Sequence, residues 1–314
     1  MKNKNIIPIV FAFDDNLVHP ACVCISSLLS SASCNTYYDI YILHSNKFNF
    51  TKTKLAELPA IYKNCKITFR EVNDEFTSAY EVRGVTSTTY YRLLIPELIP
   101  EYDKILYSDV DVIFRDDLLT FYNIDIDDYY LAGVDNASAL RPDVQKYIKD
   151  KLGIDHKYGH YYAGNLVINS AKIREDNLTK RFRQLAKNNY NQQDMDIINI
   201  ACYGKIKPLT PAFCLTNFLT EFIVKNKDRM LNFFTEDELT YALDKGIVHY
   251  NGPKPWKEWC VNFDVWWEAY RKSPIYDPQY YFDFFNQKQY ELDTFSLTRR
   301  IKLLLRYFIY GRKG

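Results

Sequence analysis

Apolar segments of strand length alternate with segments of helical pattern through the first 72 residues of the chain. A strand can follow a parallel neighbour only after a crossover connection, which is usually a helix, so this alternation predicts parallel βαβ units. The expected order is strand, helix, strand, helix, strand at 6–13, 20–31, 38–43, 51–62 and 67–72. Pro20 suits the first turn of one helix, and Thr51 can cap the other. The sequence therefore predicts an α/β fold with a mostly parallel central sheet.

Later segments continue this pattern less regularly. Strands are expected at 104–114, 131–135, 166–169 and 246–250, and helices at 87–95, 171–188 and 194–203. Pro96 is expected to stop the first of these helices, and the chain after Phe213 is expected to be irregular until the last strand. No internal repeat or low-complexity linker is present. We expect one main domain at 1–260, with an aromatic-rich, basic C-terminal segment at 261–314.

Two carboxylates separated by one residue, Asp109 and Asp111, lie at the end of the apolar run that begins at Lys104. Positions i and i+2 of a strand share a face, so where the strand bends both carboxylates can converge on one ion. Mg²⁺ and Mn²⁺ prefer oxygen ligands of this kind. The alternative is a pair of solvated loop acids.

Other acids follow predicted strands in the same way. Asp14 follows the first strand, and Asp135 ends the strand at 131–135. Ligands gather beyond the carboxyl ends of strands in open α/β sheets. The position of these acids, together with Asp109 and Asp111, supports one shared site.

Four blocks, at 7–16, 88–111, 193–199 and 249–256, resemble glycosyltransferase family 8, and the resemblance runs from about Ile6 to Trp259. This family of retaining hexosyltransferases includes bacterial lipopolysaccharide galactosyl- and glucosyltransferases. The resemblance implies a GT-A-like nucleotide-diphospho-sugar transferase fold with a helical C-terminal appendage. It also implies transfer of galactose or glucose from a UDP-sugar donor to a glycan or glycolipid acceptor, in bacterial surface polysaccharide or lipopolysaccharide synthesis.

The same resemblance implies roles for individual residues. The ligands of Mn²⁺ or Mg²⁺ would be Asp109, Asp111 and His249, and the catalytic group would add Asp194 to the two metal-binding acids. The donor contacts would be Asp14 and Asn16 to base and ribose, Arg92 to the sugar and phosphate region, Asp135 and Asp194 to sugar hydroxyls, and Gly252 and Lys254 to the diphosphate. Three alternatives stay open: His249 as a packed strand histidine, Lys254 as a solvated loop lysine, and Asn16 as only a helix cap.

The chain departs from the family pattern at two places. Tyr162 stands where relatives often carry an asparagine before the Ala-Gly pair, and Asn165 is a shifted substitute for that sugar contact. Met195 replaces the glutamine of the family's Asp-Gln-Asp sequence. A thioether is only a weak acceptor and cannot act as an oxygen nucleophile, so neither a glutamine contact nor a covalent step can involve this side chain.

The C-terminal tail is the most unevenly charged part of a chain whose net charge is +1. Its last 16 residues include no acid and six basic residues, Arg299, Arg300, Lys302, Arg306, Arg312 and Lys313. Basic and bulky apolar residues mixed in this way over 295–310 predict an interfacial helix on an anionic membrane surface, with roughly 1 kcal/mol from each basic residue. The alternatives are a helix packed on the body and an unstructured basic end.

Composition also bears on the partners and the cellular compartment of the protein. A net charge near zero gives no global attraction to nucleic acid. Seven cysteines without a CxxC pair, and no signal peptide, favour a reducing cytoplasm without structural zinc. Together with the tail, they place the protein in the cytoplasm, peripheral on the inner face of the membrane. Two rivals remain: a self-glycosylating, glycogenin-like priming enzyme, favoured by 27 tyrosines, and a non-catalytic nucleotide-sugar-binding protein.

Overall fold

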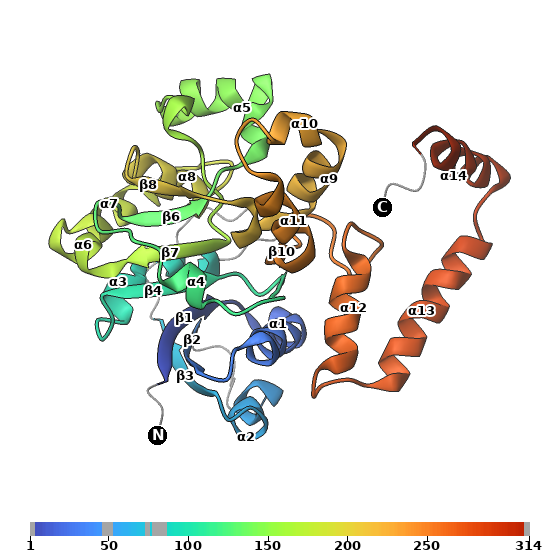
Figure 1. The fold of residues 1–314 in the computed structure, drawn as a ribbon, viewed down its shortest axis with the longest axis horizontal. Coiled ribbons are helices and arrows are strands. Elements are labelled where there is room, and N and C mark those ends of the chain that lie inside the picture. The colour runs from blue at the N-terminus through green and yellow to red at the C-terminus, as the bar shows by residue number, and fades with distance from the viewer. Residues whose placement is uncertain (1–3, 46–52, 73–75, 77–86, 311–314) are drawn as a thin grey trace.

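The computed structural model describes residues 4–45, 53–72, 76 and 87–310. A seven-stranded sheet forms the centre, in the order β3-β2-β1-β4-β7-β6-β8 (Figure 1). Its strands are β1 (Asn5–Ala12), β2 (Thr36–His44), β3 (Cys65–Glu71), β4 (Lys104–Ser108), β6 (Leu131–Val134), β7 (Asn165–Asn169) and β8 (Ile206–Leu209). All neighbours are parallel except β7, which is antiparallel to both β4 and β6. The predicted α/β fold with a mostly parallel sheet is confirmed.

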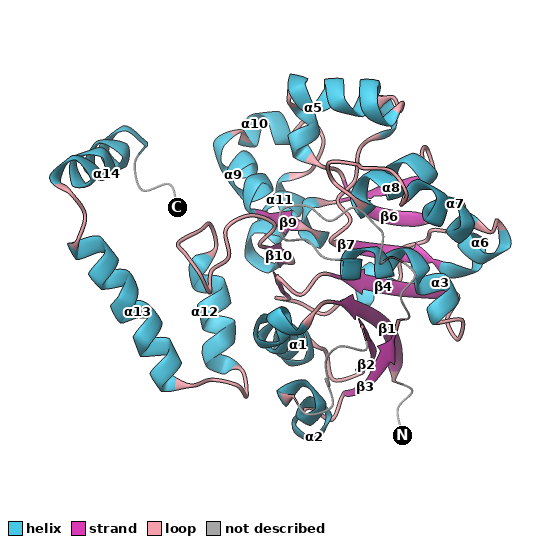
Figure 2. Ribbon diagram, turned by 180° about the vertical axis from the view of Figure 1, so that it is seen from behind, coloured by secondary structure: helices cyan, strands magenta, loops and turns pink. Residues whose placement is uncertain are grey.

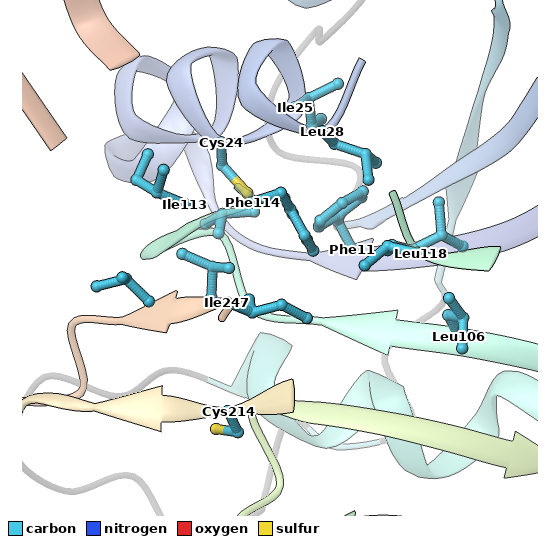
Figure 3. Packing of buried hydrophobic residues seen from close by; sticks show 14 of the residues in the cluster. Phe11, Cys24, Ile25, Leu28, Leu106, Ile113, Phe114, Leu118, Cys214 and Ile247 are labelled. Carbon is cyan, nitrogen blue, oxygen red and sulfur yellow. The ribbon is translucent and has the colours of Figure 1, made fainter. Parts of the chain in front are cut away.

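Alternate residues of β1 enter two separate hydrophobic cores, because successive side chains of a strand point to opposite faces. Ile7, Ile9 and Phe11 pack in the core that includes α1 (Val18–Ser31). Val10 and Ala12 pack in the other core, with the 3₁₀ segment η4 (Ser87–Leu94) and the helices beyond it. Figure 3 shows Phe11 next to Phe114 in the first core, which also holds Cys24, Ile25 and Leu28 of α1. Both faces of the sheet are therefore covered, as a parallel sheet requires.

A second, three-stranded sheet lies at the carboxyl end of β4. It consists of β5 (Val112–Ile113), β9 (Leu215–Thr216) and β10 (Val248–His249), in the order β5-β10-β9. β10 runs antiparallel to β5 and parallel to β9. The continuous strand expected at 104–114 is thus wrong: β4 ends at Ser108, and the chain crosses to the second sheet at 109–111. The two acids lie in this crossing.

Several expected helices have different limits. The segment expected at 51–62 is a 3₁₀ turn, η3 (Lys54–Glu57), followed by α2 (Leu58–Ile61), and its first two residues lie outside the described part. Pro96 does not stop a helix: it occupies the first turn of α3 (Ile95–Leu98), where a missing N–H costs nothing. Asn177 has a left-handed backbone, with φ of 52°, and divides the helix expected at 171–188 into α6 (Ser170–Glu175) and α7 (Leu178–Leu185).

The irregular region expected after Phe213 is also wrong. It contains α9 (Asn217–Lys225), α10 (Lys227–Met230) and α11 (Glu236–Lys245). Thr216 caps α9, and Thr235 forms a capping box with Glu238 at the start of α11. The remaining short elements are η1 (Asp15–Leu17), α4 (Leu119–Tyr122), η7 (His156–Tyr158), α8 (Asp194–Ala201) and η8 (Pro211–Phe213).

Residues 137–159 form an excursion from the sheet with a small core of its own. It contains η5 (Ala137–Leu140), α5 (Pro142–Tyr147) and a π-helical turn, η6 (Ile148–Leu152). Its buried residues are Ala139, Ile148, Leu152 and Ile154. A β-bridge joins Asp135 to Tyr161, so the two ends of the excursion lie side by side.

The C-terminal segment is helical, as expected, with α12 (Phe263–Lys272), α13 (Pro278–Asp293) and α14 (Leu297–Tyr310). Trp267 of α12 packs on Phe284 and Phe285 of α13, with ring centroids 4.5 and 5.1 Å apart. In Figures 1 and 2, the chain turns after α12 so that α13 runs back beside it, and α14 lies at the far end of α13, apart from the sheet. Among the described residues, no helix has the length and apolar character needed to cross a bilayer.

Candidate active site

Asp109, Asp111 and His249 meet where the two sheets adjoin. The acids lie in the crossing from β4 to β5, and His249 ends β10, which pairs with β5. His249 Nε2 lies 3.6 Å from an Asp109 oxygen and 3.3 Å from an Asp111 oxygen. One ligand atom from each residue falls within 4.8 Å of the other two. The three residues expected to bind a metal are therefore brought together.

Gly164 keeps this cluster open. A Cβ at this position would lie 2.2 Å from His249 Cε1 and 2.9 Å from an Asp109 oxygen. The Gly164 carbonyl also accepts a hydrogen bond of 2.8 Å from the Asp109 N–H, which fixes its distance from the acids. Any larger residue would fill the space between the ligands. Two carboxylates and one imidazole around such a space fit Mn²⁺ or Mg²⁺.

Lys254 compensates the charge of the cluster in this structure. Its Nζ lies 2.5 Å from an Asp111 oxygen and also donates to the Tyr250 carbonyl. Burial alone would raise the pKa of Asp111, but Lys254 and His249 outweigh burial and hold that pKa well below its usual range. Burial would lower the pKa of His249, yet the Asp111 carboxylate raises it well above its ordinary value. The site is thus built to hold positive charge against Asp111.

Arg92 links the cluster to Asp194. Its guanidinium donates to Asp109 at 2.8 Å, forms an ion pair with Asp194 at 3.1 Å, and donates to the Ala163 carbonyl at 2.7 Å. The same group lies over the Tyr107 ring, 4.4 Å from its centroid. Arg92 is buried, and a rigid planar fork suits this simultaneous binding of several oxygens. Arg92 therefore positions both acids from within the second core.

Asp194 begins α8 and is buried beside Arg92. One oxygen accepts from Thr89 Oγ1 at 3.1 Å, and the other faces Arg92 Nε. Burial raises the pKa of Asp194 to about 6 despite the Arg92 charge, and the Asp109 charge adds to the rise. Its preceding residue, Gln193, has φ of 48°, a strained conformation for a residue with a side chain. This backbone turns Asp194 toward the cluster.

The remaining predicted donor residues Asp14, Asp135 and Gly252 follow the ends of β1, β6 and β10. Asp14 accepts a hydrogen bond of 3.1 Å from the Asn16 N–H, so Asp14, and not Asn16, caps the first turn. The alternative that Asn16 is only a helix cap is therefore wrong. Asp135 is exposed and accepts from the His160 N–H at 3.0 Å. Gly252 is exposed, and a Cβ there would meet no atom within 4 Å.

The residues that depart from the family pattern are buried or half-buried in the two cores and the sheet. Tyr162 is buried in the first core, and its hydroxyl lies 3.4 Å from Thr216 Oγ1. Asn165 is buried as well, and its side-chain oxygen accepts from Ser108 Oγ at 2.7 Å. Met195 is half-buried against both cores. The Asn165 side chain therefore accepts a hydrogen bond within the sheet, from Ser108 of the neighbouring strand β4.

Asp196 does not reach the cluster either. It is fully buried and accepts from the Tyr147 hydroxyl at 2.7 Å and from the Gln192 N–H at 2.9 Å. Its other oxygen lies 3.4 Å from His160 Nε2. Asp196 therefore ties α8 to the excursion at 137–159, whereas Asp194 contacts Arg92.

Sequence reasoning did not find Thr89, Tyr107 or Gly164. Tyr107 donates to Asp109 at 2.7 Å, and it precedes that acid by two residues, so the shared strand face was a usable signal. Thr89 lies three residues before Arg92, the spacing of neighbours on a helix, and accepts from its guanidinium at 3.0 Å. The contact of Gly164 with His249 spans distant segments, so no local pattern indicates it.

A mostly parallel sheet, with an Asp-x-Asp pair at a strand end and a histidine beside it, defines a GT-A-like glycosyltransferase. The chain belongs to glycosyltransferase family 8, whose family model matches residues 8–260. A protein of Haemophilus influenzae that carries a glycosyltransferase name is 28% identical over 264 residues, which are 82% of this chain and 74% of its own length. A lipopolysaccharide 1,2-glucosyltransferase of Escherichia coli is 25% identical over 195 residues, 59% of this chain and 55% of that protein.

Solved structures show the same fold. The galactosyltransferase LgtC, in complex with donor and acceptor sugar analogs, superposes with a TM-score of 0.69 at 24% identity. The superposition covers 87% of this chain and 99% of LgtC. The glycosyltransferase GlyE of Streptococcus pneumoniae superposes with a TM-score of 0.61 at 20% identity, over 84% of this chain and 60% of GlyE.

Proposed function

We propose that the protein transfers a hexose, galactose or glucose, from a UDP-sugar to a glycan or glycolipid acceptor with retention at the anomeric carbon. The observation that carries the proposal is the Asp109–Asp111–His249 cluster joined through Arg92 to Asp194. Support also comes from relatives named as a lipopolysaccharide glucosyltransferase and a galactosyltransferase. Surface polysaccharide or lipopolysaccharide synthesis is the setting that these names favour.

Different residues would bind different parts of the UDP-sugar donor. A divalent ion held by Asp109, Asp111 and His249 would supply Lewis-acid neutralisation of the diphosphate. Lys254 forms an ion pair with Asp111 in this structure. When the donor binds, Lys254 would leave Asp111 and bind the phosphates as a point charge. Asp194, with both oxygens already oriented by Thr89 and Arg92, would accept from sugar hydroxyls. Asp14, Asn16, Asp135, Asn165 and Gly252 remain proposed donor contacts.

The test is metal-dependent release of UDP. With a panel of UDP-sugars and no acceptor, slow hydrolysis is expected with UDP-galactose or UDP-glucose in Mn²⁺ or Mg²⁺. EDTA should abolish it and added metal should restore it, because a carboxylate-rich site cannot itself neutralise the leaving diphosphate. Release that is unchanged in EDTA would refute metal dependence, and release from no UDP-sugar would favour a binding protein. A ladder of hexoses on the intact protein would favour self-glycosylation.

We also propose that α14 places the enzyme on an anionic membrane surface, on the cytoplasmic face. Leu297, Ile301, Leu304 and Leu305 repeat at helical spacing and are 46–73% exposed. An apolar stripe of this spacing, without a covering partner among the described residues, suits the interface of a bilayer. Arg299, Arg300 and Lys302 supply the complementary charge.

Deleting the residues after Phe295 should leave transfer to a soluble acceptor nearly unchanged and abolish sedimentation with anionic liposomes. The aromatic contacts of α12 and α13 remain in this variant, so the body should keep its fold. A full-length variant that carries both Ile301→Asp and Leu305→Asp should behave like the truncation. High salt should reproduce part of the effect, because salt screens surface charge. Liposome binding that survives the deletion would refute the membrane role of α14.

A further inference from the structure

Cys214 lies directly behind the histidine of the cluster. It precedes β9, is fully buried, and its Sγ is 3.4 Å from His249 Nδ1. The other ring nitrogen, Nε2, faces Asp109 and Asp111. The imidazole therefore presents one nitrogen to the acids and the other to a thiol.

The backbone fixes this contact. Leu215 pairs with Val248 in the parallel β9–β10 ladder, and the Leu215 N–H donates to the Ile247 carbonyl at 2.8 Å. Gly164 lies against the same ring, where a Cβ would be 2.8 Å from Nδ1. The register of the second sheet and the absence of a Gly164 side chain thus set the distance between Cys214 and His249.

We propose that Cys214 is a positioning residue for His249, whose Nδ1–H donates to the Cys214 sulfur while Nε2 is held toward the acids. The proposal rests on the cation site of the proposed function. A neutral imidazole that binds a cation through Nε2 carries its proton on Nδ1, and the partner of that proton sets the tautomer and the ring plane. A thiol sulfur is a weak acceptor, and here the backbone holds it 3.4 Å from Nδ1.

The competing explanation is that Cys214 only fills space, since a buried thiol also behaves as a small apolar residue. Two substitutions separate these roles. Cys214→Ala removes the acceptor and keeps an apolar side chain. Cys214→Ser keeps an acceptor but places a polar hydroxyl in an apolar core, which costs stability unless it is bonded. If Cys214 only fills space, Cys214→Ala should be the milder of the two changes. If Cys214 positions His249, Cys214→Ser should be the milder change.

The experiment titrates Mn²⁺ alone into wild type, the two Cys214 variants and Cys202→Ala, and follows free Mn²⁺ by electron paramagnetic resonance. Cys202 is the matched control, because it is equally buried but belongs to the other core. Cys214→Ala is expected to raise the Kd for Mn²⁺ about tenfold or more, the usual effect of losing an outer partner of a ligand. Cys214→Ser and Cys202→Ala should stay close to wild type, and melting temperatures of the metal-free proteins should show any general loss of packing.

An unchanged Kd in Cys214→Ala would overturn the proposal, as would a Cys214→Ser variant that binds Mn²⁺ no better than the alanine variant. An equal loss in Cys202→Ala would also overturn it, since the effect would then follow from loosened packing. If wild type binds no Mn²⁺, the cation site itself fails and this proposal fails with it. If wild type binds and Cys214→Ala binds as well, only the role of Cys214 is refuted.

Discussion

Asp109→Asn and Asp111→Asn are each expected to reduce UDP release by about 100-fold or more. Asparagine keeps nearly the size of aspartate but removes one negative charge at the point where His249 and the second acid converge. Loss of one close charge contact with a catalytic cation costs several kcal/mol, and each 1.36 kcal/mol is a tenfold change in rate. The measurement is the rate of UDP release at saturating Mn²⁺, together with the Kd for Mn²⁺.

Asp103→Asn is the matched control for this charge change. Asp103 lies just before the other end of β4, is largely exposed, and pairs with Arg174 at the surface. It should keep the wild-type rate, because exposed ion pairs contribute little. A variant of Asp109 or Asp111 that retained more than about a tenth of the wild-type rate would contradict a role in cation-assisted departure of UDP.

Gly164→Ala is expected to abolish Mn²⁺ binding and to lower UDP release as severely as loss of an acid. The new Cβ would lie 2.2 Å from His249 Cε1 and 2.9 Å from Asp109 Oδ2, a separation that atoms do not tolerate. His249 belongs to a strand and contacts Cys214, so its ring has little freedom to move aside. The change therefore displaces two ligands at once, and titration of Mn²⁺ measures it directly.

Gly133→Ala provides the comparison. Gly133 lies in β6, next to the strand β7 that follows Gly164, and an added Cβ would press on Leu166 at 3.1 Å. This variant should lose some stability on thermal unfolding, because overpacking strains a core, but it should bind Mn²⁺ like wild type. If Gly164→Ala retained normal Mn²⁺ affinity, the glycine would not be what keeps the ligands apart.

The strands of the first half of the sheet could be predicted because burial on both faces gives continuous apolar runs, as in β1 and β2. The acids at the ends of apolar runs, such as Asp14 and Asp109, were found from the same apolar pattern. Helices α9 and α11 were missed, although the capping box at Thr235 and Glu238 is a readable start signal. Aromatic residues such as Phe218 and Phe222 obscured the helical period there.

Contacts between distant segments account for what sequence reasoning could not find at the site. A continuous strand through Asp109 was the simplest interpretation of 104–114, yet Asp109 bonds to Gly164 and Asp111 lies beside β10. Only the pairing of β5 with β10 explains why the chain leaves one sheet and enters another at this point. Arg92 was assigned by resemblance alone, and its role in holding Asp109 and Asp194 together depends on tertiary packing.

The excursion at 137–159 has a consequence for how such an enzyme can diversify. Its ends are joined at Asp135 and Tyr161, and the Asn136 N–H donates to the His160 carbonyl at 2.7 Å. Because the entry and exit points coincide, inserting or removing residues between them adds little loop-closure entropy and leaves the sheet undisturbed. A replacement would have to supply new partners for Asp196, since a buried carboxylate without Tyr147 and His160 would be costly. Within that condition, this stretch can change in length and sequence while the sheet and the Asp109–Asp111–His249 cluster keep their structure.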